Sequence, residues 1–394
     1  LAFRQIENRI HDVLETYANT HSKEASNADK TTNYYELARA SLASNLELSE
    51  DFAILPSGCG TTAAIKHFQE LLGLYIPPAT KKRFGFKIDI KTAPLVIVGP
   101  YEHHSNEVSF REALCEIQRI DLDKQGLVDL NHLKLVLEEN KHREIIASFC
   151  IASNVTGIIT PYEEISKMLR SYNAIVCFDA AASSPYMNIP SHLYDAMFMS
   201  PHKLLGGPAS CGLLIIRKSL VDTSIPPSFS GGGTVLYVNK TSQTYQKEIE
   251  AREEAGTPPI LQFIRASLAY QLRNEIGFEF IKKQKDELKE YFISELKKIP
   301  NCEIYGNQEA SNIGIVSFNI KGLSPYDLCN RLSLEDNFQT RAGCSCAGPY
   351  GHDLLGIEKL DMNNRPGWVR ISIHFSQTKE DIKNLIDGIK NIIL

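Results

Sequence analysis

The sequence predicts an α/β fold with a mostly parallel sheet, together with a smaller α+β domain. Between about Asp51 and Lys218, short apolar runs alternate with helical stretches, which is typical of parallel strands covered by helices on both faces. A chain of 394 residues is also too long for one compact core. We therefore expect a large domain over residues 20–258 and a small C-terminal domain over 259–394, joined by an N-terminal helix at 1–19.

Six short apolar segments are the candidate strands of the large sheet: Phe52–Leu55, Leu95–Val98, Ile145–Phe149, Ile175–Phe178, Ala196–Met199 and Leu213–Ile216. Helical periodicity appears at Phe3–Thr16, and a polar segment rich in Ser, Asn and Thr follows at Asn19–Asn33. Pro77–Pro94 and Ser228–Thr234 are expected to be loops, because proline and consecutive glycines interrupt regular structure.

The last third of the chain has a different pattern. A hinge is expected at Gly256–Pro259, followed by a long amphipathic helical region at Ile260–Lys298. Thr378, with Asp381 three residues later, resembles a capping box at the start of a final helix. The segments expected to form the small domain are Ile313–Ile320, Trp368–Phe375 and Lys379–Ile393.

Composition and charge restrict the function classes. A net charge of −5 and a pI of about 6.2 argue against nucleic acid or an anionic membrane as the main partner. No apolar run approaches the roughly 18 residues that cross a bilayer. The nine cysteines are scattered without the spacing of a disulfide framework, which indicates a reducing compartment. We therefore expect a cytoplasmic protein.

A lysine and an aspartate stand at the ends of two predicted strands. Lys203 closes the run Ser200-Pro-His-Lys, and Asp179 lies 24 residues before it. A lysine in apolar surroundings must be neutral, paired or covalently engaged, unless it reaches solvent at an edge. An amine that forms an imine and a carboxylate that protonates a pyridine nitrogen are what pyridoxal 5'-phosphate (PLP) needs. For Asp179, a helix N-cap is the alternative.

A glycine-rich turn is the candidate phosphate site. Ser57-Gly-Cys-Gly-Thr-Thr62 follows the first strand and opens a helix at Ala63–Leu72. Glycines allow a tight turn, and a helix N-terminus offers free N–H groups to an anion. An ordinary strand–helix connection is the alternative.

A histidine motif and an arginine complete the polar candidates. Glu102-His-His-Ser-Asn106 follows the second strand, where an imidazole could stack on a cofactor ring and exchange protons with a substrate. Arg370 alternates with apolar residues in Trp368–Phe375 and suits a substrate carboxylate. A structural histidine and a surface ion pair are the respective alternatives.

Two cysteines lie in a glycine-containing segment, Arg341–Gly351, which is expected to be a flexible, exposed loop. Arg341 could favour a thiolate there. A zinc site from Cys344, Cys346 and His352 lacks a fourth ligand at a recognisable spacing, so we expect no metal.

The order of these motifs resembles the class V aminotransferase group of fold-type I PLP-dependent enzymes, and within it the cysteine desulfurases and selenocysteine lyases. The resemblance spans nearly the whole chain. The motifs that carry it are Gly-Thr-Thr, Glu-His-His-Ser-Asn, Ser-Asn-Val-Thr-Gly, Phe-Asp-Ala-Ala, Ser-Pro-His-Lys, Gly-Gly-Gly-Thr and Glu-Ala-Gly-Thr-Pro.

This resemblance implies how PLP would be held. Lys203 corresponds to the Schiff-base lysine, Asp179 to the partner of the pyridine nitrogen, and His103 to the acid/base histidine that stacks on the ring. Gly233 and Thr234 correspond to a loop that reaches the neighbouring subunit's phosphate, which implies a homodimer. The contacts to the cofactor's phosphate end are expected from Gly60, Thr61, Thr62, Ser200 and His202.

The resemblance also implies a reaction. Cys346 corresponds to a sulfur-accepting cysteine, so the expected activity removes sulfur from L-cysteine, giving alanine and a persulfide that a sulfur-acceptor protein would collect. The residues expected to bind the amino acid substrate are Asn154, Arg370 and Arg341.

Two departures from the family pattern keep other reactions open. Ala182 stands where the family usually has glutamine, and Ser345 stands where it usually has histidine, with an extra thiol at Cys344. The alternatives are a class V aminotransferase, a C–S lyase or an epimerase acting on another amino acid. A PLP-fold scaffold or sulfur-carrier partner without turnover is a further alternative, against which the presence of Lys203, Asp179 and Arg370 together counts.

Overall fold

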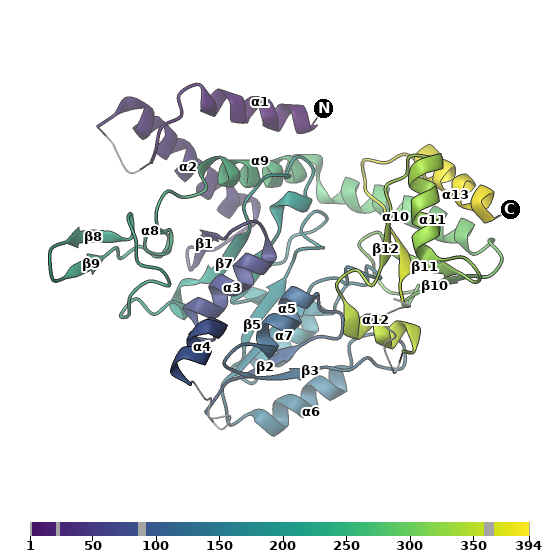
Figure 1. The fold of residues 1–394 in the computed structure, drawn as a ribbon, viewed down its shortest axis with the longest axis horizontal. Coiled ribbons are helices and arrows are strands. Elements are labelled where there is room, and N and C mark those ends of the chain that lie inside the picture. The colour runs from purple at the N-terminus through teal and green to yellow at the C-terminus, as the bar shows by residue number, and fades with distance from the viewer. Residues whose placement is uncertain (1, 21–23, 86–91, 358–365, 394) are drawn as a thin grey trace.

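The protein is described by a computed structural model that covers residues 2–20, 24–85, 92–357 and 366–393. Two sheets organise it (Figure 1). A seven-stranded sheet in the order β1-β7-β6-β5-β4-β2-β3 forms the larger part, and a four-stranded sheet in the order β10-β11-β13-β12 lies beside it.

The large sheet is mostly parallel, as predicted. Only β7 runs against its neighbours. The central strands are buried on both faces, which explains why they read as continuous apolar runs. Its strands are β1 (Phe52–Pro56), β2 (Leu95–Val98), β3 (Glu116–Arg119), β4 (Ile145–Cys150), β5 (Ile175–Asp179), β6 (Ala196–Met199) and β7 (Leu213–Arg217).

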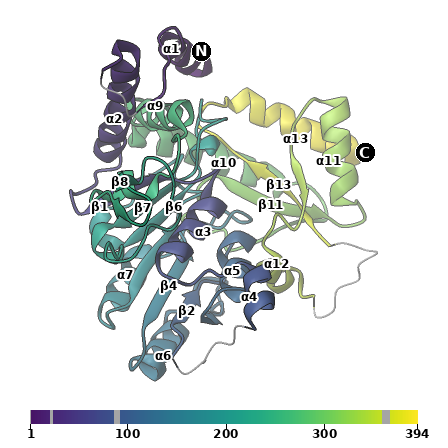
Figure 2. The ribbon, with the colours of Figure 1, turned by 60° about the vertical axis from the view of Figure 1, so that its left-hand side comes forward.

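Helices cover both faces of this sheet (Figure 2). On one face, α3 (Thr61–Leu71), α5 (His104–Arg111) and α8 (Ile249–Glu253) contribute side chains to one apolar core. On the other face a second core is built from α1 (Ala2–Leu14), α2 (Ser26–Asn45), α6 (Leu130–Asn140), α7 (Tyr162–Arg170) and α9 (Ile260–Ile276).

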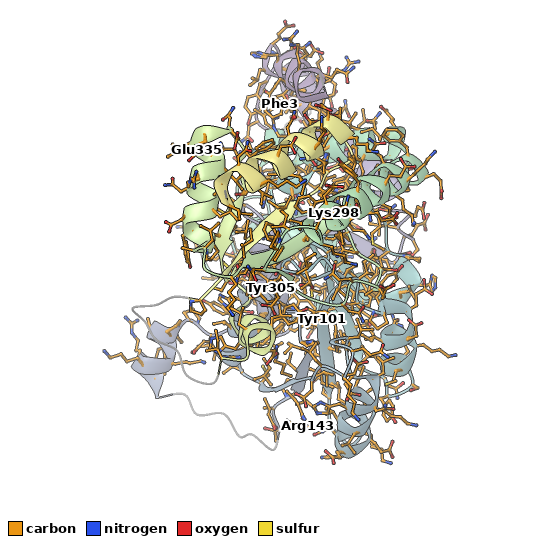
Figure 3. The ribbon with its side chains drawn as sticks, turned by 90° about the vertical axis from the view of Figure 1, so that its right-hand side faces the viewer. Phe3, Tyr101, Arg143, Lys298, Tyr305 and Glu335 are labelled. Carbon is orange, nitrogen blue, oxygen red and sulfur yellow. The ribbon has the colours of Figure 1, made fainter. Side chains whose placement is uncertain are left out.

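The small sheet is antiparallel throughout and has its own core. Three helices cover it; Figure 3 views this side, with Glu335 at the end of α11 and Lys298 just beyond α10. Thr378 and Asp381 form the predicted capping box, each backbone N–H donating to the other's side chain at 2.7 and 3.1 Å. The elements are β10 (Cys302–Ile304), β11 (Ile315–Ile320), β12 (Arg341–Gly343), β13 (Trp368–Ser372), α10 (Phe278–Leu296), α11 (Pro325–Glu335), α12 (Gly348–Leu355) and α13 (Lys379–Ile393).

Some elements differ from the sequence prediction. The polar segment at Asn19–Asn33 contains the start of α2. Its Ser, Asn and Thr residues have low helix propensity, but packing against α9 stabilises the helix. The predicted single helical region at Ile260–Lys298 is two helices, because Gly277 takes a positive φ of 88° between them.

One of the two expected loops, Pro77–Pro94, also holds regular structure, whereas Ser228–Thr234 contains no helix or strand, as predicted. A short helix, α4 (Pro78–Phe84), begins at the second of two prolines, where a missing N–H costs nothing. Residues 86–91 of that expected loop lie outside the described residues. Beyond Thr234, β8 (Val235–Val238) and β9 (Gln243–Tyr245) form a protruding hairpin (Figure 1).

The division into domains at residue 258 stays a prediction. Across the described ranges, no helix has the length and apolar character needed to cross a bilayer.

Candidate active site

A cavity of about 730 Å³ opens at the carboxyl edge of the parallel strands, where α/β sheets place their ligands. The turns that follow β1, β2, β5 and β6 all reach it. Its lining includes predicted site residues from five separate segments of the chain: Gly60, Thr61, Thr62, His103, Asn154, Asp179, Ser200, His202 and Lys203.

Lys203 and Asp179 both line this cavity, and the charge of each shifts the pKa of the other. Lys203 ends a short 3₁₀ turn, Pro201–Lys203, directly after β6. Desolvation lowers the pKa of its amine, against the opposing effect of Asp179, while Arg370 and Arg341 lower it further. Burial raises the pKa of the Asp179 carboxyl, and a hydrogen bond from the Ala181 N–H (2.8 Å) and the charge of Lys203 oppose this.

The glycine-rich turn forms a polar cradle at the start of α3. The Ser200 hydroxyl accepts a hydrogen bond from the Thr61 N–H at 3.0 Å and lies 2.9 Å from the Thr61 hydroxyl. Thr62 Oγ1 lies 2.6 Å from the Ser105 hydroxyl, and His202 Nδ1 lies 2.9 Å from the Cys59 carbonyl oxygen. The hydroxyl groups of these residues therefore lie close together at the N-terminus of α3.

Gly60 keeps this cradle open. A Cβ at that position would lie 2.8 Å from His202 Cε1 and 3.2 Å from Ser200 Oγ, so any side chain would fill the space. No side chain of the turn's own residues caps the N-terminus of α3. An open cradle of donors at a helix N-terminus suits a phosphate group, and Asp179 and Lys203 stand beside it. The residues present therefore fit PLP.

His103 is the N-cap of α5. Its Nδ1 accepts a hydrogen bond from the Ser105 N–H at 3.1 Å, so the proton of the neutral ring sits on Nε2. Burial, followed by the charge of Lys203, lowers its pKa to about 4. The ring is therefore neutral near pH 7.

Glu102, beside His103, is a site residue to which the sequence analysis gave no role. It is fully buried and accepts hydrogen bonds from the Cys150 N–H (2.9 Å), the Gly99 N–H (3.2 Å) and the Asn106 amide (2.6 Å). Burial raises its pKa to about 8. It ties β2, β4 and α5 together behind His103. Its position as the first residue of the Glu-His-His-Ser-Asn motif is the sequence feature that could have identified it.

The predicted substrate-binding residues come from both sheets. Arg341 and Arg370 are directly paired across β12 and β13. Arg370 Nη1 donates to the Asn154 carbonyl at 3.0 Å, while its Nε and the Asn154 Oδ1 are buried without a partner. Two adjacent guanidinium groups, one of them with an unused buried donor, suit a carboxylate.

Cys346 lies on a fixed turn rather than on the expected flexible loop. β12 precedes it and α12 follows it. In the turn Cys344–Ala347, the Ala347 N–H donates to the Cys344 carbonyl at 3.1 Å. Ser345 and Cys346 both have positive φ, 53° and 60°, which defines a type I′ turn and is costly for residues with a side chain.

Contacts to the large sheet's layer hold this strained turn. The Asn154 amide donates to the Ser345 carbonyl at 2.6 Å, and the His104 N–H donates to the Cys346 carbonyl at 2.8 Å. His104 Nε2 accepts from the Gly348 N–H at 2.8 Å. The glycines at 343 and 348 therefore do not make the segment a free loop.

Cys346 lines a second cavity of about 460 Å³, together with Arg341, Cys344 and His352. Arg341 Nη2 is 3.8 Å from Cys346 Sγ. Among the described residues, neither Cys346 nor the two arginines line the Lys203 cavity. No group of three or more metal-binding side chains occurs in the described parts of the chain.

Gly233 and Thr234 are not brought to the cavity within one chain. Thr234 is fully buried, and its hydroxyl donates to the Gly231 carbonyl at 2.8 Å in its own loop. Ala182, the departure from the family pattern, does line the Lys203 cavity.

Comparisons with known proteins agree with this architecture. The profile of the family described as "Aminotransferase class-V" matches residues 3–385. The chain therefore belongs to the class V aminotransferase family, whose members are PLP-dependent enzymes. The fold is that of the fold-type I PLP enzymes.

Several relatives are named as cysteine desulfurases. A probable cysteine desulfurase of Streptomyces coelicolor is 27% identical over 398 residues, covering 99% of this chain and 89% of its own. One of Staphylococcus epidermidis is 27% identical over 393 residues, covering 98% and 88%. The apo structure of a cysteine desulfurase from Thermococcus onnurineus superposes with a TM-score of 0.83 at 25% identity, covering 100% of this chain and 91% of that one.

Proposed function

We propose that this protein is a PLP-dependent cysteine desulfurase, which converts L-cysteine to alanine and leaves a persulfide on Cys346. The observation that carries the proposal is the fixed position of Cys346. Its sulfur lies 3.8 Å from Arg341 Nη2, and Arg341 is paired with Arg370 across β12 and β13. The relatives named as cysteine desulfurases support the same reaction.

The residues of the large cavity would hold and tune the cofactor. Lys203 would bind it covalently through its amine, Asp179 would pair with the pyridine nitrogen, and the cradle at Gly60 would receive the phosphate. When bound, PLP supplies an electron sink for negative charge at the substrate's α-carbon. Burial lowers the pKa of the Lys203 amine and so favours its neutral form, which would take a proton from that carbon once the amine is released.

The arginine pair would orient the substrate. Arg370 has a free, buried Nε, and a carboxylate there would satisfy it while neutralising two adjacent cations. The neutral His103 ring lines the cavity and carries its proton on Nε2. These contacts would place the substrate's sulfur toward Cys346.

Cys346 would perform the sulfur transfer. A thiolate at Sγ forms an S–S bond to the substrate sulfur while the C–S bond breaks, and the carbon ends as the methyl group of alanine. Arg341 stabilises the thiolate by its charge. The electron pair of the broken C–S bond stays with the carbon, which takes a proton, so the carbon is reduced as the sulfur is oxidised and no external oxidant is needed.

The test is Cys346→Ser. We expect it to abolish alanine and sulfide formation from L-cysteine, with a loss of at least about 10²-fold. PLP binding and the visible spectral change on adding L-cysteine should persist, because Lys203 and the cradle are unchanged. Cys302→Ser, a half-buried cysteine on β10, is the matched control. Turnover of L-cysteine by Cys346→Ser at the parental rate would contradict the persulfide mechanism.

A second candidate is a class V aminotransferase, C–S lyase or epimerase. It is favoured by the observation that Cys346 lines a different cavity from Lys203. In these reactions Lys203 and the cofactor suffice for proton transfer, and Cys346 has no chemical role. Keto acid, free sulfide without persulfide, or a D-amino acid as the product would distinguish the three.

We also infer a homodimer. The loop Gly231–Thr234 leads into the protruding β8–β9 hairpin, where Leu236, Tyr237 and Val238 are each more than half exposed. A row of apolar side chains of this kind is typical of an interface. Tyr237→Asp should weaken self-association in sedimentation measurements and lower PLP affinity, if a partner loop completes the phosphate site. A parental protein that is monomeric and still binds PLP tightly would contradict this.

Our proposals for the cellular location and for a protein partner both rest on the cysteine thiols. All nine cysteines are free, which supports a reducing, cytoplasmic compartment. A persulfide product supports a sulfur-acceptor protein as the partner.

A further inference from the structure

We propose that Cys344 is a second sulfur carrier, which receives the sulfane sulfur from Cys346 and presents it at the surface. This inference rests on the proposed desulfurase function and extends it to the outward path of the sulfur.

The fixed position of Cys346 creates the need for such a path. Its turn is held by Asn154 and His104, and α12 begins one residue after Ala347. Tyr350 in that helix is fully buried and shares a hydrogen bond of 3.1 Å with Thr156. A segment anchored on both sides cannot swing its sulfur out to a protein acceptor without breaking these contacts.

Cys344 stands where it can take over. It is exposed, whereas Cys346 is half-buried, and both line the same 460 Å³ cavity. The two residues are positions i and i+2 of the type I′ turn. A sulfur atom shared between two thiols spans about 4 Å, two S–S bond lengths. The Cα atoms of residues two apart cannot be more than about 7 Å from each other, because consecutive Cα atoms are about 3.8 Å apart.

The transfer balances without a redox partner. The Cys344 thiol first loses its proton to water. Its thiolate then attacks the outer sulfur of the Cys346 persulfide, so that one S–S bond forms as the other breaks. The Cys346 thiolate leaves, and Arg341 Nη2 at 3.8 Å stabilises it. Cys346 is then free to accept a second sulfur.

This predicts a stoichiometry. Holoenzyme is mixed with a few equivalents of L-cysteine per chain and no other thiol, and the reaction is quenched with an alkylating reagent at the end of the first burst of alanine, before free L-cysteine can accept sulfur from a persulfide. Alanine is then counted, and persulfides are located by mass spectrometry with fragmentation. We expect two alanines per chain and persulfide on both Cys346 and Cys344 in the parental protein. Cys344→Ser should give one alanine and persulfide on Cys346 only. Cys302→Ser should behave as the parent.

The outcomes separate the two proposals. One alanine per parental chain, with persulfide on Cys346 alone, overturns the relay and leaves the desulfurase function standing. A Cys344–Cys346 disulfide with released sulfide also overturns it, because the attack then falls on the inner sulfur. No persulfide on either cysteine overturns the proposed function itself. Persulfide on Cys344 in Cys346→Ser contradicts the order of transfer.

Discussion

The Lys203 cavity and the Cys346 cavity are built in different ways. The first is formed by the ends of strands in one sheet, and burial shifts the pKa of His103, Asp179 and Lys203 there. The second lies on the small sheet and gains its shape from contacts across to the large one, at Asn154 and His104. The comparison suggests that cofactor chemistry depends on one rigid layer, while sulfur chemistry depends on how two layers meet.

The largest effect is expected in the first cavity. Lys203→Ala should lower turnover of L-cysteine by at least about 10³-fold, because both the covalent hold on PLP and the proton-transferring amine are lost. Borohydride reduction of the parental holoenzyme should fix the pyridoxyl group on the Lys203 peptide. Label on Lys66, which also lines the cavity, would show that the site has been assigned to the wrong lysine.

A smaller effect is expected where the two layers meet. Arg370→Gln should raise KM for L-cysteine about 10- to 100-fold, the value of one or two charge-assisted hydrogen bonds. PLP affinity should stay within about twofold, because Arg370 does not line the cofactor's cavity. Arg331→Gln, which loses an exposed pair with Glu335 on α11, is the matched control. A fall in PLP affinity by the same factor as the rise in KM would remove the distinction between the two regions.

The sequence predicted the first region better than the second, for a physical reason. Strand ends such as Asp179 and Ser200 follow buried apolar runs, and the carboxyl ends of parallel strands meet at one edge. The order of motifs along the chain therefore already specified which side chains gather there.

No comparable local rule describes the second region. Glycines near Cys346 suggested mobility, yet contacts from Asn154 and His104, about 190 and 240 residues earlier, fix the turn. The separation of Cys346 from the Lys203 cavity and the positive φ of Ser345 are likewise set by tertiary packing. A helix such as α2 was missed for the same reason, because its stabilising contacts with α9 lie far along the chain.

The smallest expected effect concerns the electrostatics of the first cavity. In the folded protein without PLP, the pKa of His103 is about 4, against an ordinary value of 6.5. Between these values the unfolded chain binds a proton that the folded chain does not, so acid favours unfolding and this contribution to stability is lost as pH falls from about 6.5 toward 4. Glu102, with its pKa raised to about 8, acts in the opposite direction, so the useful quantity is the difference between variant and parent.

His103→Asn isolates the contribution of the ring. Asparagine keeps an N-cap acceptor for the Ser105 N–H but cannot titrate. We expect its free energy of unfolding, relative to the parent, to improve by about 1 kcal/mol between pH 7.5 and pH 5, after allowing for the solvent screening of a half-buried ring. Urea unfolding of the PLP-free proteins at both pH values measures this, with His142→Asn, at an exposed position, as the control. An unchanged difference would mean that the folded His103 ring is as free to take a proton as an exposed one. The Lys203 cavity would then lack the electrostatic character that distinguishes it from the Cys346 cavity.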